Sequence, residues 1–220
     1  WGMTAVEVVD RAWCPRYAAR VLRNGKGGPS PSWLVGRLDA VGLRSINNVV
    51  DVTNDGLMEC SQPLHSFDYD KLAENRIVVR RGKGGERMVS IDETTCTLDE
   101  TMLIIADAER PVAIAGVMGG LDTEVTEATT NVLIESAQFD PLSVRGTSRK
   151  LRLMSESNYR FERGVDPVGV DAASLRACQL ILELAGGELA EGVVDAWAAP
   201  YEAPEVAVRP RRCSDLLGLD

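Results

Sequence analysis

Four segments of the chain carry apolar residues at the spacing of an amphipathic helix. In the first, Leu34, Leu38 and Val41 follow one another at i, i+4 and i+7, behind a Ser-Pro pair that suits a helix N-terminus. The second contains Asp55-Gly56, an unusual pair inside a helix. The last ends at a Gly-Gly pair, which suits a C-terminus. Helices are therefore predicted over 31–41, 49–59, 141–151 and 167–185.

Short runs rich in Val, Ile and other apolar residues occupy the middle of the chain. Gly, Asp, Glu or Pro separates each run from the next, and these residues form the turns between strands. Because the strands follow one another and the helices come before and after them, we expect an α+β fold with mixed or antiparallel sheets, not a doubly wound parallel sheet. The predicted strands are 77–80, 88–91, 102–106, 112–115, 132–134 and 192–197.

The domain organisation is predicted as one main domain over 1–199, a linker over 200–208, and the truncated start of another domain over 209–220. A chain of 220 residues with 45% hydrophobic content can bury one sizeable core. The opening Trp1-Gly2-Met3 suggests a piece of a longer protein. No apolar run approaches the roughly 20 residues that cross a bilayer, so we expect no membrane partner.

The charge of the chain argues against nucleic-acid binding by bulk electrostatics, since its net charge is −9. Six basic residues against two acidic ones give 141–165 a local charge of +4, for which a solvated surface is the commoner explanation. The five cysteines are widely spaced without a Cys-x-x-Cys pair, and a single histidine cannot complete the usual zinc sets. We therefore expect a reducing, cytoplasmic setting and no structural metal.

The single histidine, His65, is the first candidate for acid–base chemistry, because its ordinary pKa lies near neutrality. A lone histidine is nevertheless more often structural. Glu135 is a candidate hydrogen-bond acceptor, because it continues an apolar strand and a buried carboxylate must accept hydrogen bonds. Its role is either that of a structural acceptor or that of a group that binds the hydroxyl of a ligand.

Three further polar or glycine-rich segments are candidates for the same pocket. Thr53 and Asn54 lie in an otherwise apolar helix, where they either cap local backbone or face a site. The glycines of 115–120 permit either a tight turn or close approach of the backbone to a ligand. The mixed aromatic and charged residues of 155–167 suit a polar partner or helix capping. Residue chemistry alone thus predicts a globular domain with a polar, metal-free pocket.

Five phrases of the sequence, in the same order and spacing, resemble the β-subunit family of bacterial phenylalanine–tRNA ligase. The likeness covers the B3/B4 region, which edits mischarged tRNA, from about Cys14 to Pro200. The tail from Arg209 to Leu219 resembles the opening of the next domain of that subunit. The five phrases are Cys14–Tyr17, Ile46–Asn54, Gln62–His65, Ala115–Gly120 and Tyr159–Pro167.

The resemblance implies an editing hydrolase that removes tyrosine attached in error to tRNA(Phe). In that family the carboxylate at the position of Glu135 would accept a hydrogen bond from the tyrosine phenol, and Gly119 would add a backbone contact. The residues implied around the ester and the attacking water, as catalytic groups, are His65, Thr53 and Asn54. The remaining substrate-binding positions that the resemblance implies are Ala115, Gly116, Ser155 and Ser157.

The same resemblance implies the partners of the chain. They are the 3′ end of tRNA(Phe) and the α subunit, in a heterotetramer of two α and two β subunits. ATP and magnesium are expected for the whole ligase and no cofactor for this part.

A rival hypothesis is a non-catalytic module that joins subunits or holds tRNA. Two departures from the family pattern stand out, namely Ser157 in place of alanine and Asp55-Gly56 in place of bulkier residues, which would loosen their helix.

Overall fold

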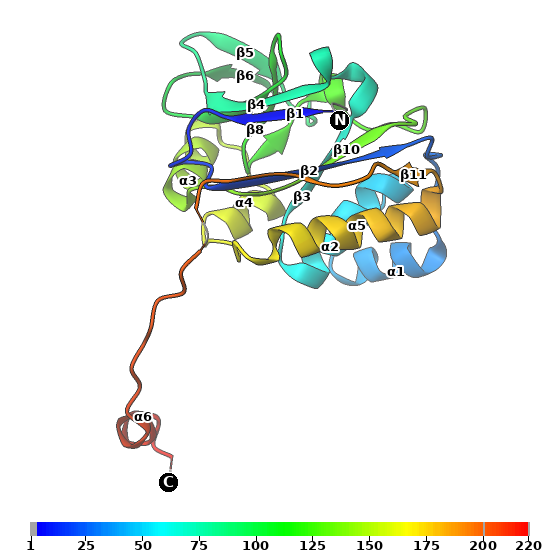
Figure 1. Ribbon diagram of the computed structural model, residues 1–220. Coiled ribbons are helices and arrows are strands. Elements are labelled where there is room, and N and C mark those ends of the chain that lie inside the picture. The colour runs from blue at the N-terminus through cyan, green and yellow to red at the C-terminus, as the bar shows by residue number, and fades with distance from the viewer. Residues whose placement is uncertain (1–3, 200, 220) are drawn as a thin grey trace.

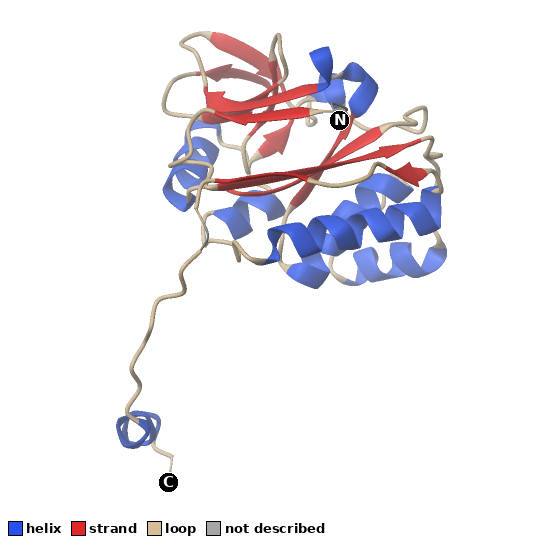
Figure 2. Ribbon diagram, in the orientation of Figure 1, coloured by secondary structure: helices blue, strands red, loops and turns tan. Residues whose placement is uncertain are grey.

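The computed structural model describes residues 4–199 and 201–219. The first range forms three layers, and the second forms an extended C-terminal tail (Figures 1 and 2). A small sheet with a β-hairpin forms the first layer, a second sheet lies in the middle, and helices cover the outer face of the second sheet. The predicted α+β class with mixed and antiparallel sheets is confirmed.

The first sheet has the strand order β1-β4-β7-β8-β9. Its β1 and β4 run parallel, and the other neighbours are antiparallel. A separate hairpin of β5 and β6 packs beside β8. The bounds of these strands are Ala5–Val8 (β1), Arg76–Arg81 (β4), Glu86–Val89 (β5), Thr95–Leu98 (β6), Leu103–Ala106 (β7), Pro111–Ile114 (β8) and Met118–Gly119 (β9).

The second sheet is antiparallel throughout and has the order β11-β2-β10-β3, with β12 also paired to β2. Its two inner strands, β2 and β10, therefore carry partners on both sides. The bounds are Arg16–Arg23 (β2), Leu64–Asp68 (β3), Val132–Gln138 (β10), Glu188–Leu189 (β11) and Val194–Trp197 (β12).

The long helices α2 and α5 pack against each other, with α1 against α2 and α5 against β2 and β10. The shorter α3 and α4 lie together at one end of the sheets (Figure 1). Short 3₁₀ turns cover 69–71, 73–75 and 121–123. The helices are Ser32–Ala40 (α1), Asn48–Cys60 (α2), Pro141–Leu151 (α3), Glu156–Phe161 (α4), Gly169–Ala185 (α5) and Pro210–Leu217 (α6).

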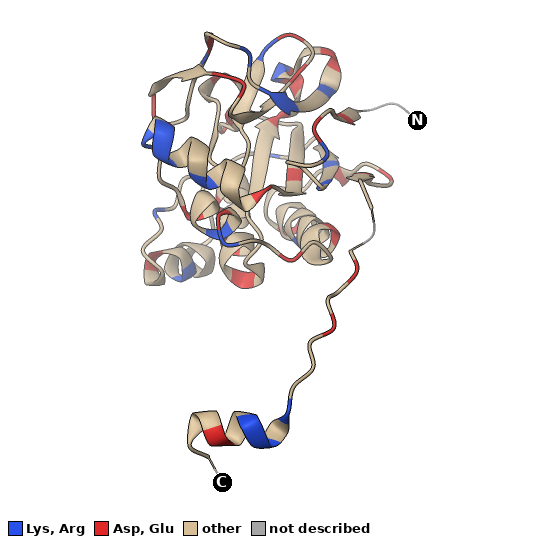
Figure 3. Ribbon diagram, turned by 90° about the vertical axis from the view of Figure 1, so that its left-hand side faces the viewer, with Lys and Arg blue, Asp and Glu red and all other residues tan. Residues whose placement is uncertain are grey.

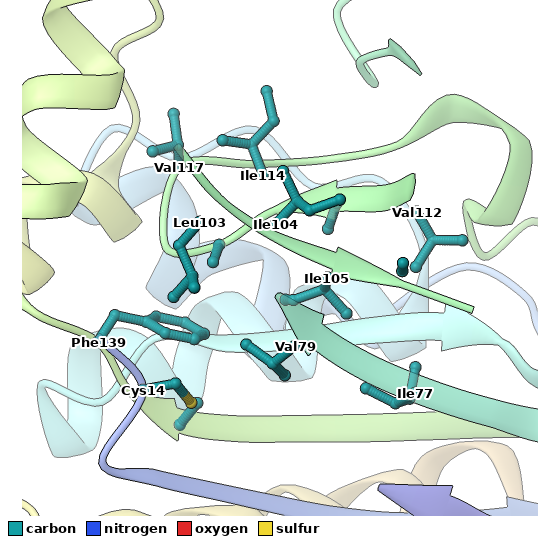
Figure 4. Close-up of a cluster of buried hydrophobic side chains, with 14 of the residues drawn as sticks. Cys14, Ile77, Val79, Leu103, Ile104, Ile105, Val112, Ile114, Val117 and Phe139 are labelled. Atoms are coloured by element: carbon teal, nitrogen blue, oxygen red, sulfur yellow. The ribbon is translucent and has the colours of Figure 1, made fainter. Parts of the chain in front are cut away.

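Two hydrophobic cores lie on the two faces of the second sheet. The residues of β10 alternate between them, so that Leu133 and Ala137 join the core between the sheets while Val132 and Ile134 join the core beneath the helices. Figure 4 shows part of the inter-sheet core. By the same alternation Glu135 points toward that inter-sheet core, where a carboxylate is costly to bury.

Neither β2 nor β3 was predicted from the sequence, although both flank β10. Arg16 and Arg20 interrupt the apolar pattern of β2, because charged side chains are expected on the exposed face of a strand. Instead both are buried: Arg16 pairs with Asp195 at 2.7 Å and stacks 3.8 Å over the Trp197 ring. Arg20 pairs with Asp171 at 2.5 Å. These ion pairs supply the partners that buried guanidinium groups require.

The pair Asp55-Gly56 does not interrupt the predicted helix, since α2 continues through both residues to Cys60. Gly56 lies so close to β3 that a Cβ there would come within 2.9 Å of Leu64 Cδ1. Asp55 forms an ion pair with Arg37 of α1, with 3.2 Å between Oδ1 and Nε. The small residue thus permits close packing of α2 on the sheet, and the acidic one ties α2 to α1.

The tail forms no helix or strand over 201–209, and α6 then lies apart from the three layers (Figure 1). The domain limits stay a prediction, and residues 1–3, 200 and 220 of the predicted segments lie outside the described residues. Over the described ranges, no helix has both the length and the apolar composition that a bilayer crossing requires.

Replacing Asn47 by Ala should destabilise the domain by about 1 kcal/mol, because the Asn47 side chain caps α2 by accepting from the backbone N–H groups of Val49 and Val50. Urea unfolding of both proteins measures this difference. Asp39→Ala, on the exposed face of α1, is the control and should change stability by less than about 0.5 kcal/mol. Equal losses in the two variants would contradict the assigned cap.

Candidate functional site

A cavity of about 230 Å³ lies between the two sheets. It is bounded at its sides by α2, α4 and the loop of residues 115–120, called the glycine-rich loop below. Eight of the nine predicted site residues line it. The exception is Ala115, which is buried in the inter-sheet core instead. The eight lining residues are Thr53, Asn54, His65, Gly116, Gly119, Glu135, Ser155 and Ser157.

The register of the second sheet brings Glu135 and His65 together. On β10, Glu135 is paired with His65 of β3 on one side and with Ala19 of β2 on the other. Side chains directly opposite on neighbouring strands lie on the same face, so both point toward the inter-sheet cavity. The amide of Gln62 donates to the carbonyl of Ala137 at 2.9 Å and fixes the start of β3 against β10. The candidate hydroxyl-binding residue Glu135 and the candidate acid–base residue His65 are therefore neighbours in one sheet.

Tyr17 is the protein's own hydrogen-bond partner of Glu135. Its hydroxyl donates to Oε2 of Glu135 over 2.9 Å, and its ring is fully buried. It reaches Glu135 diagonally, past Ala19, whose small side chain leaves room. Tyr17 lies in one of the family motifs, but no role was predicted for it because β2 was not recognised as a strand. With the strand known, period-two alternation places Tyr17 on the face of Glu135.

Burial shifts the pKa values at this site in the directions that desolvation dictates. The pKa of Glu135 is raised to about 7 by burial, which the hydrogen bond from Tyr17 partly opposes. The pKa of the Tyr17 hydroxyl is raised well above its usual value by burial and by the neighbouring Glu135 carboxylate. Near neutral pH, Glu135 is thus close to the midpoint of its titration and Tyr17 remains a hydrogen-bond donor.

His65 keeps one ring nitrogen without a protein partner. Its Nε2 is buried and makes no hydrogen bond to any described residue. Its ring meets that of Phe67 edge to face, with centroids 4.4 Å apart. Burial lowers the pKa of His65 to about 4, so the imidazole is neutral at pH 7. A neutral imidazole with an unpaired nitrogen at a cavity can bind water or a polar ligand atom.

Gly119 forms the wall against which the His65 ring rests. A Cβ added to Gly119 would lie 2.4 Å from Cε1 and 2.7 Å from Nε2 of His65. Any side chain there would displace the imidazole. Gly116 is required for a different reason, since its φ is +70° and its Cβ would lie 2.9 Å from Val144. The loop is therefore a tight turn whose backbone also borders the cavity, and its close approach to a ligand stays a prediction.

The helix α2 presents Val50, Thr53 and Asn54 to the cavity, at the i, i+3, i+4 spacing of one helical face. The hydroxyl of Thr53 donates to the carbonyl of Val50 over 2.7 Å. The two alternatives for this pair, local capping and facing a site, therefore both apply to Thr53.

Ser155 and Ser157 approach from α4. Ser155 is the N-cap of α4, where it accepts from the backbone N–H of Asn158, and its hydroxyl donates to the carbonyl of Val117 at 2.8 Å. Capping thus explains part of this segment, and the second bond ties α4 to the glycine-rich loop. Ser157 lines the cavity, so its hydroxyl adds a polar group to the wall. Further lining residues, for which no site role was predicted, are Ile46, Met118, Glu124 and Phe161.

The basic residues of 141–165 lie on α3, on α4 and just after these helices, and none of them lines the cavity. Arg160 and Arg163 form ion pairs with acidic residues of α4 and its C-terminal end. Arg145, Arg149 and Arg152 are exposed and have no ion pair with a described residue (Figure 3 shows the Lys and Arg positions along this part of the surface). In the described part of the chain, no three His, Cys, Asp or Glu side chains group as they would around a metal ion.

Residues 13–186 match the model of the B3/4 domain family. The chain belongs to this family. The match contains all of the cavity residues, so the site described above is a feature of the B3/4 domain itself and not of the tail.

Named relatives of this B3/4 domain are β subunits of phenylalanine–tRNA ligase. The chain is 53% identical to that of Rhodopirellula baltica over 94% of its length and 52% identical to that of Moorella thermoacetica over 100%. It spans only 30% and 27% of those two proteins. The resemblance to this ligase subunit that the motifs indicated is confirmed.

A solved structure has the same fold. It is an N-terminal fragment of the phenylalanyl-tRNA synthetase β-subunit of Pyrococcus horikoshii, with a TM-score of 0.52 and 12% identity. The likeness covers 99% of this chain and 60% of that one. At so low an identity it supports the architecture of the B3/4 domain but not the identity of individual site residues.

Replacing Glu135 by Gln should make stability depend differently on pH. The folded pKa of Glu135 is about 7 against an ordinary 4.5, so the stability that Glu135 contributes is present below pH 4.5 and is lost as the pH rises through 7. Gln does not titrate. The unfolding free energy of the variant should therefore rise relative to the parent between pH 4.5 and 7, by on the order of 3 kcal/mol. Urea unfolding across this range measures the difference, and parallel curves would contradict the burial assigned to Glu135.

Proposed function

We propose that this B3/4 domain is the editing site of a phenylalanine–tRNA ligase β subunit and hydrolyses tyrosine from mischarged tRNA(Phe). The observation that carries the proposal is the pairing of Glu135 with His65 across two strands in one cavity. One residue offers a buried carboxyl group and the other an unpaired imidazole nitrogen. A specific acceptor beside a water-binding group is what an ester hydrolase selective for a hydroxylated side chain requires.

The chemical logic of selection rests on the extra hydroxyl of tyrosine. A synthetic site that accepts phenylalanine cannot strongly reject a side chain that only adds a hydroxyl, whereas a second site that hydrogen-bonds this hydroxyl can separate the two. A tyrosine phenol would donate to the ionised Glu135, a bond of about 1.5–3 kcal/mol. A phenylalanine side chain would leave Oε1 of this buried carboxylate without a donor, since Tyr17 donates only to Oε2. The site would therefore bind tyrosine in preference to phenylalanine, which is the preference that proofreading requires.

Hydrolysis places modest demands on the site, because an aminoacyl ester is already activated. We propose that the neutral His65 binds and polarises the attacking water through Nε2. Thr53 and Asn54 from α2 and the backbone of the glycine-rich loop would surround the ester carbonyl, where N–H groups stabilise a developing oxyanion. The terminal ribose hydroxyl of the tRNA can assist the proton transfer.

The partners of the site follow from the same proposal. The 3′ end of tRNA(Phe) would enter the cavity, and the α subunit would supply the synthetic site in a tetramer of two α and two β subunits. ATP and magnesium would act in that synthetic site. A cytoplasmic location is in keeping with such a role in translation. Because the net charge is −9, most of the affinity for tRNA would come from the rest of the ligase.

Substituting Glu135 tests the proposed selectivity. In the assembled ligase that carries this sequence, Glu135→Gln and Glu135→Ala should each reduce the preference for Tyr-tRNA(Phe) over Phe-tRNA(Phe) by roughly 10- to 100-fold, the value of one hydrogen bond to a charged group. Deacylation rates of the two charged tRNAs give the preference. An unchanged preference in both variants would remove Glu135 as the selecting residue.

Substituting His65 tests the proposed hydrolysis. His65→Ala should slow deacylation of Tyr-tRNA(Phe) by about 100-fold, the lower range for a group that acts on the attacking water. Circular dichroism should show an unchanged fold. Asp39→Ala, at an exposed position of α1 that does not line the cavity, is the control and should leave the rate unaltered. Full activity in both His65→Ala and Glu135→Ala would favour the non-catalytic scaffold over the hydrolase.

A further inference from the structure

Tyr17 presents to Glu135 the same chemical group that the proposed substrate would present. Its phenolic hydroxyl donates to Oε2 over 2.9 Å. Among the described residues this is the hydrogen bond that the Glu135 side chain makes, so the second oxygen, Oε1, is left for a ligand in the cavity. A carboxylate can accept through both oxygens at once. The site therefore has room for one internal phenol and one from a substrate.

The strand register fixes this arrangement. Tyr17 and Glu135 lie diagonally on adjacent strands, since Tyr17 is opposite Ala137 and Glu135 is opposite Ala19. Diagonal pairs of this kind are within reach only of long or aromatic side chains. Tyr17 is completely buried, and Phe67 and Leu133 belong to the same core, so its ring has little freedom to move. The donor on Glu135 is thus held by the backbone and by packing.

We propose that Tyr17 is a positioning residue for specificity, which holds the Glu135 carboxylate ionised and oriented so that Oε1 accepts the phenol of the substrate. The inference rests on the proposed editing function and deepens it. Without the Tyr17 hydroxyl, Glu135 can rotate, and it is more readily protonated. The free-energy penalty for a buried group without a partner is larger for a charged group than for a neutral one. Bound phenylalanine is therefore penalised less when Glu135 is protonated than when it is ionised. Discrimination should then fall even though Glu135 is still present.

The pH dependence follows from the groups around Glu135. Those that titrate are Tyr17 on β2, His65 on β3, Cys14 before β2 and Glu124 at the cavity wall. Of these, Tyr17 is the one that lowers the pKa of Glu135, through its hydrogen bond. Burial raises the pKa of Cys14, which keeps its thiol neutral, and His65 is neutral at pH 7. Removal of the Tyr17 hydroxyl should therefore shift the ionisation of Glu135 to higher pH.

The test is Tyr17→Phe in the assembled ligase, which removes the hydroxyl and keeps the ring. The ratio of deacylation rates on Tyr-tRNA(Phe) and Phe-tRNA(Phe) should fall by about 10-fold, and the pH at which this ratio reaches half its maximum should rise. The ratio is measured on the same folded molecules, so partial unfolding does not affect it. The control is Ser136→Ala, which removes a buried hydroxyl without a partner from the neighbouring position of β10 and should leave the ratio and its pH profile unchanged.

The outcomes separate this inference from the proposed function. If the parent ligase prefers Tyr-tRNA(Phe) and Glu135→Gln abolishes that preference while Tyr17→Phe keeps both the ratio and the pH profile, the role of Tyr17 is overturned and the editing function stands. If the parent ligase shows no preference, the proposed function fails first. Equal losses in Tyr17→Phe and Ser136→Ala would assign Tyr17 a merely structural role and also overturn the inference.

Discussion

The Glu135 carboxyl group lies between two packed sheets, and the cost of desolvating its charge governs the chemistry of the whole site. The same removal from water raises the pKa of Glu135 to about 7 and lowers that of His65 to about 4. The directions are opposite because burial disfavours an anion in one residue and a cation in the other. At neutral pH the cavity therefore holds an imidazole without charge beside a carboxyl group that one hydrogen bond can tip toward ionisation.

The fold delivers this pair through strand register and not through a local motif. Glu135 and His65 are separated by about seventy positions in the chain but are opposite one another on β10 and β3. Tyr17 comes from a third strand, β2. Glycine at 119 lets the loop touch the imidazole, and α2 closes the remaining side with Thr53. Every part of the site is held by a regular element or by a turn tied to one, which suits the proposed binding of a single hydroxyl.

Most residues of the site could be predicted from the sequence, whereas two strands of the sheet that carries them, β2 and β3, could not. The site residues that the resemblance implied line the cavity, except Ala115, whose side chain packs in the core. The strand β2 was missed because Arg16 and Arg20 break its apolar pattern. Their buried ion pairs with β12 and α5 are long-range contacts that no local pattern records. With that strand missed, Tyr17 could not be placed beside Glu135.

Local sequence predicted the helices α1, α2, α3 and α5, most strands of the first sheet and the α+β class, because helical spacing, turn residues and β-branched runs act over a few residues. It also supplied the family resemblance. Tertiary structure alone decided that Tyr17 donates to Glu135 beside His65, and hence which of these side chains is charged. The reason is physical: pKa values and hydrogen-bond partners depend on burial and on neighbours across the sheet, and both arise only when distant strands have paired and packed.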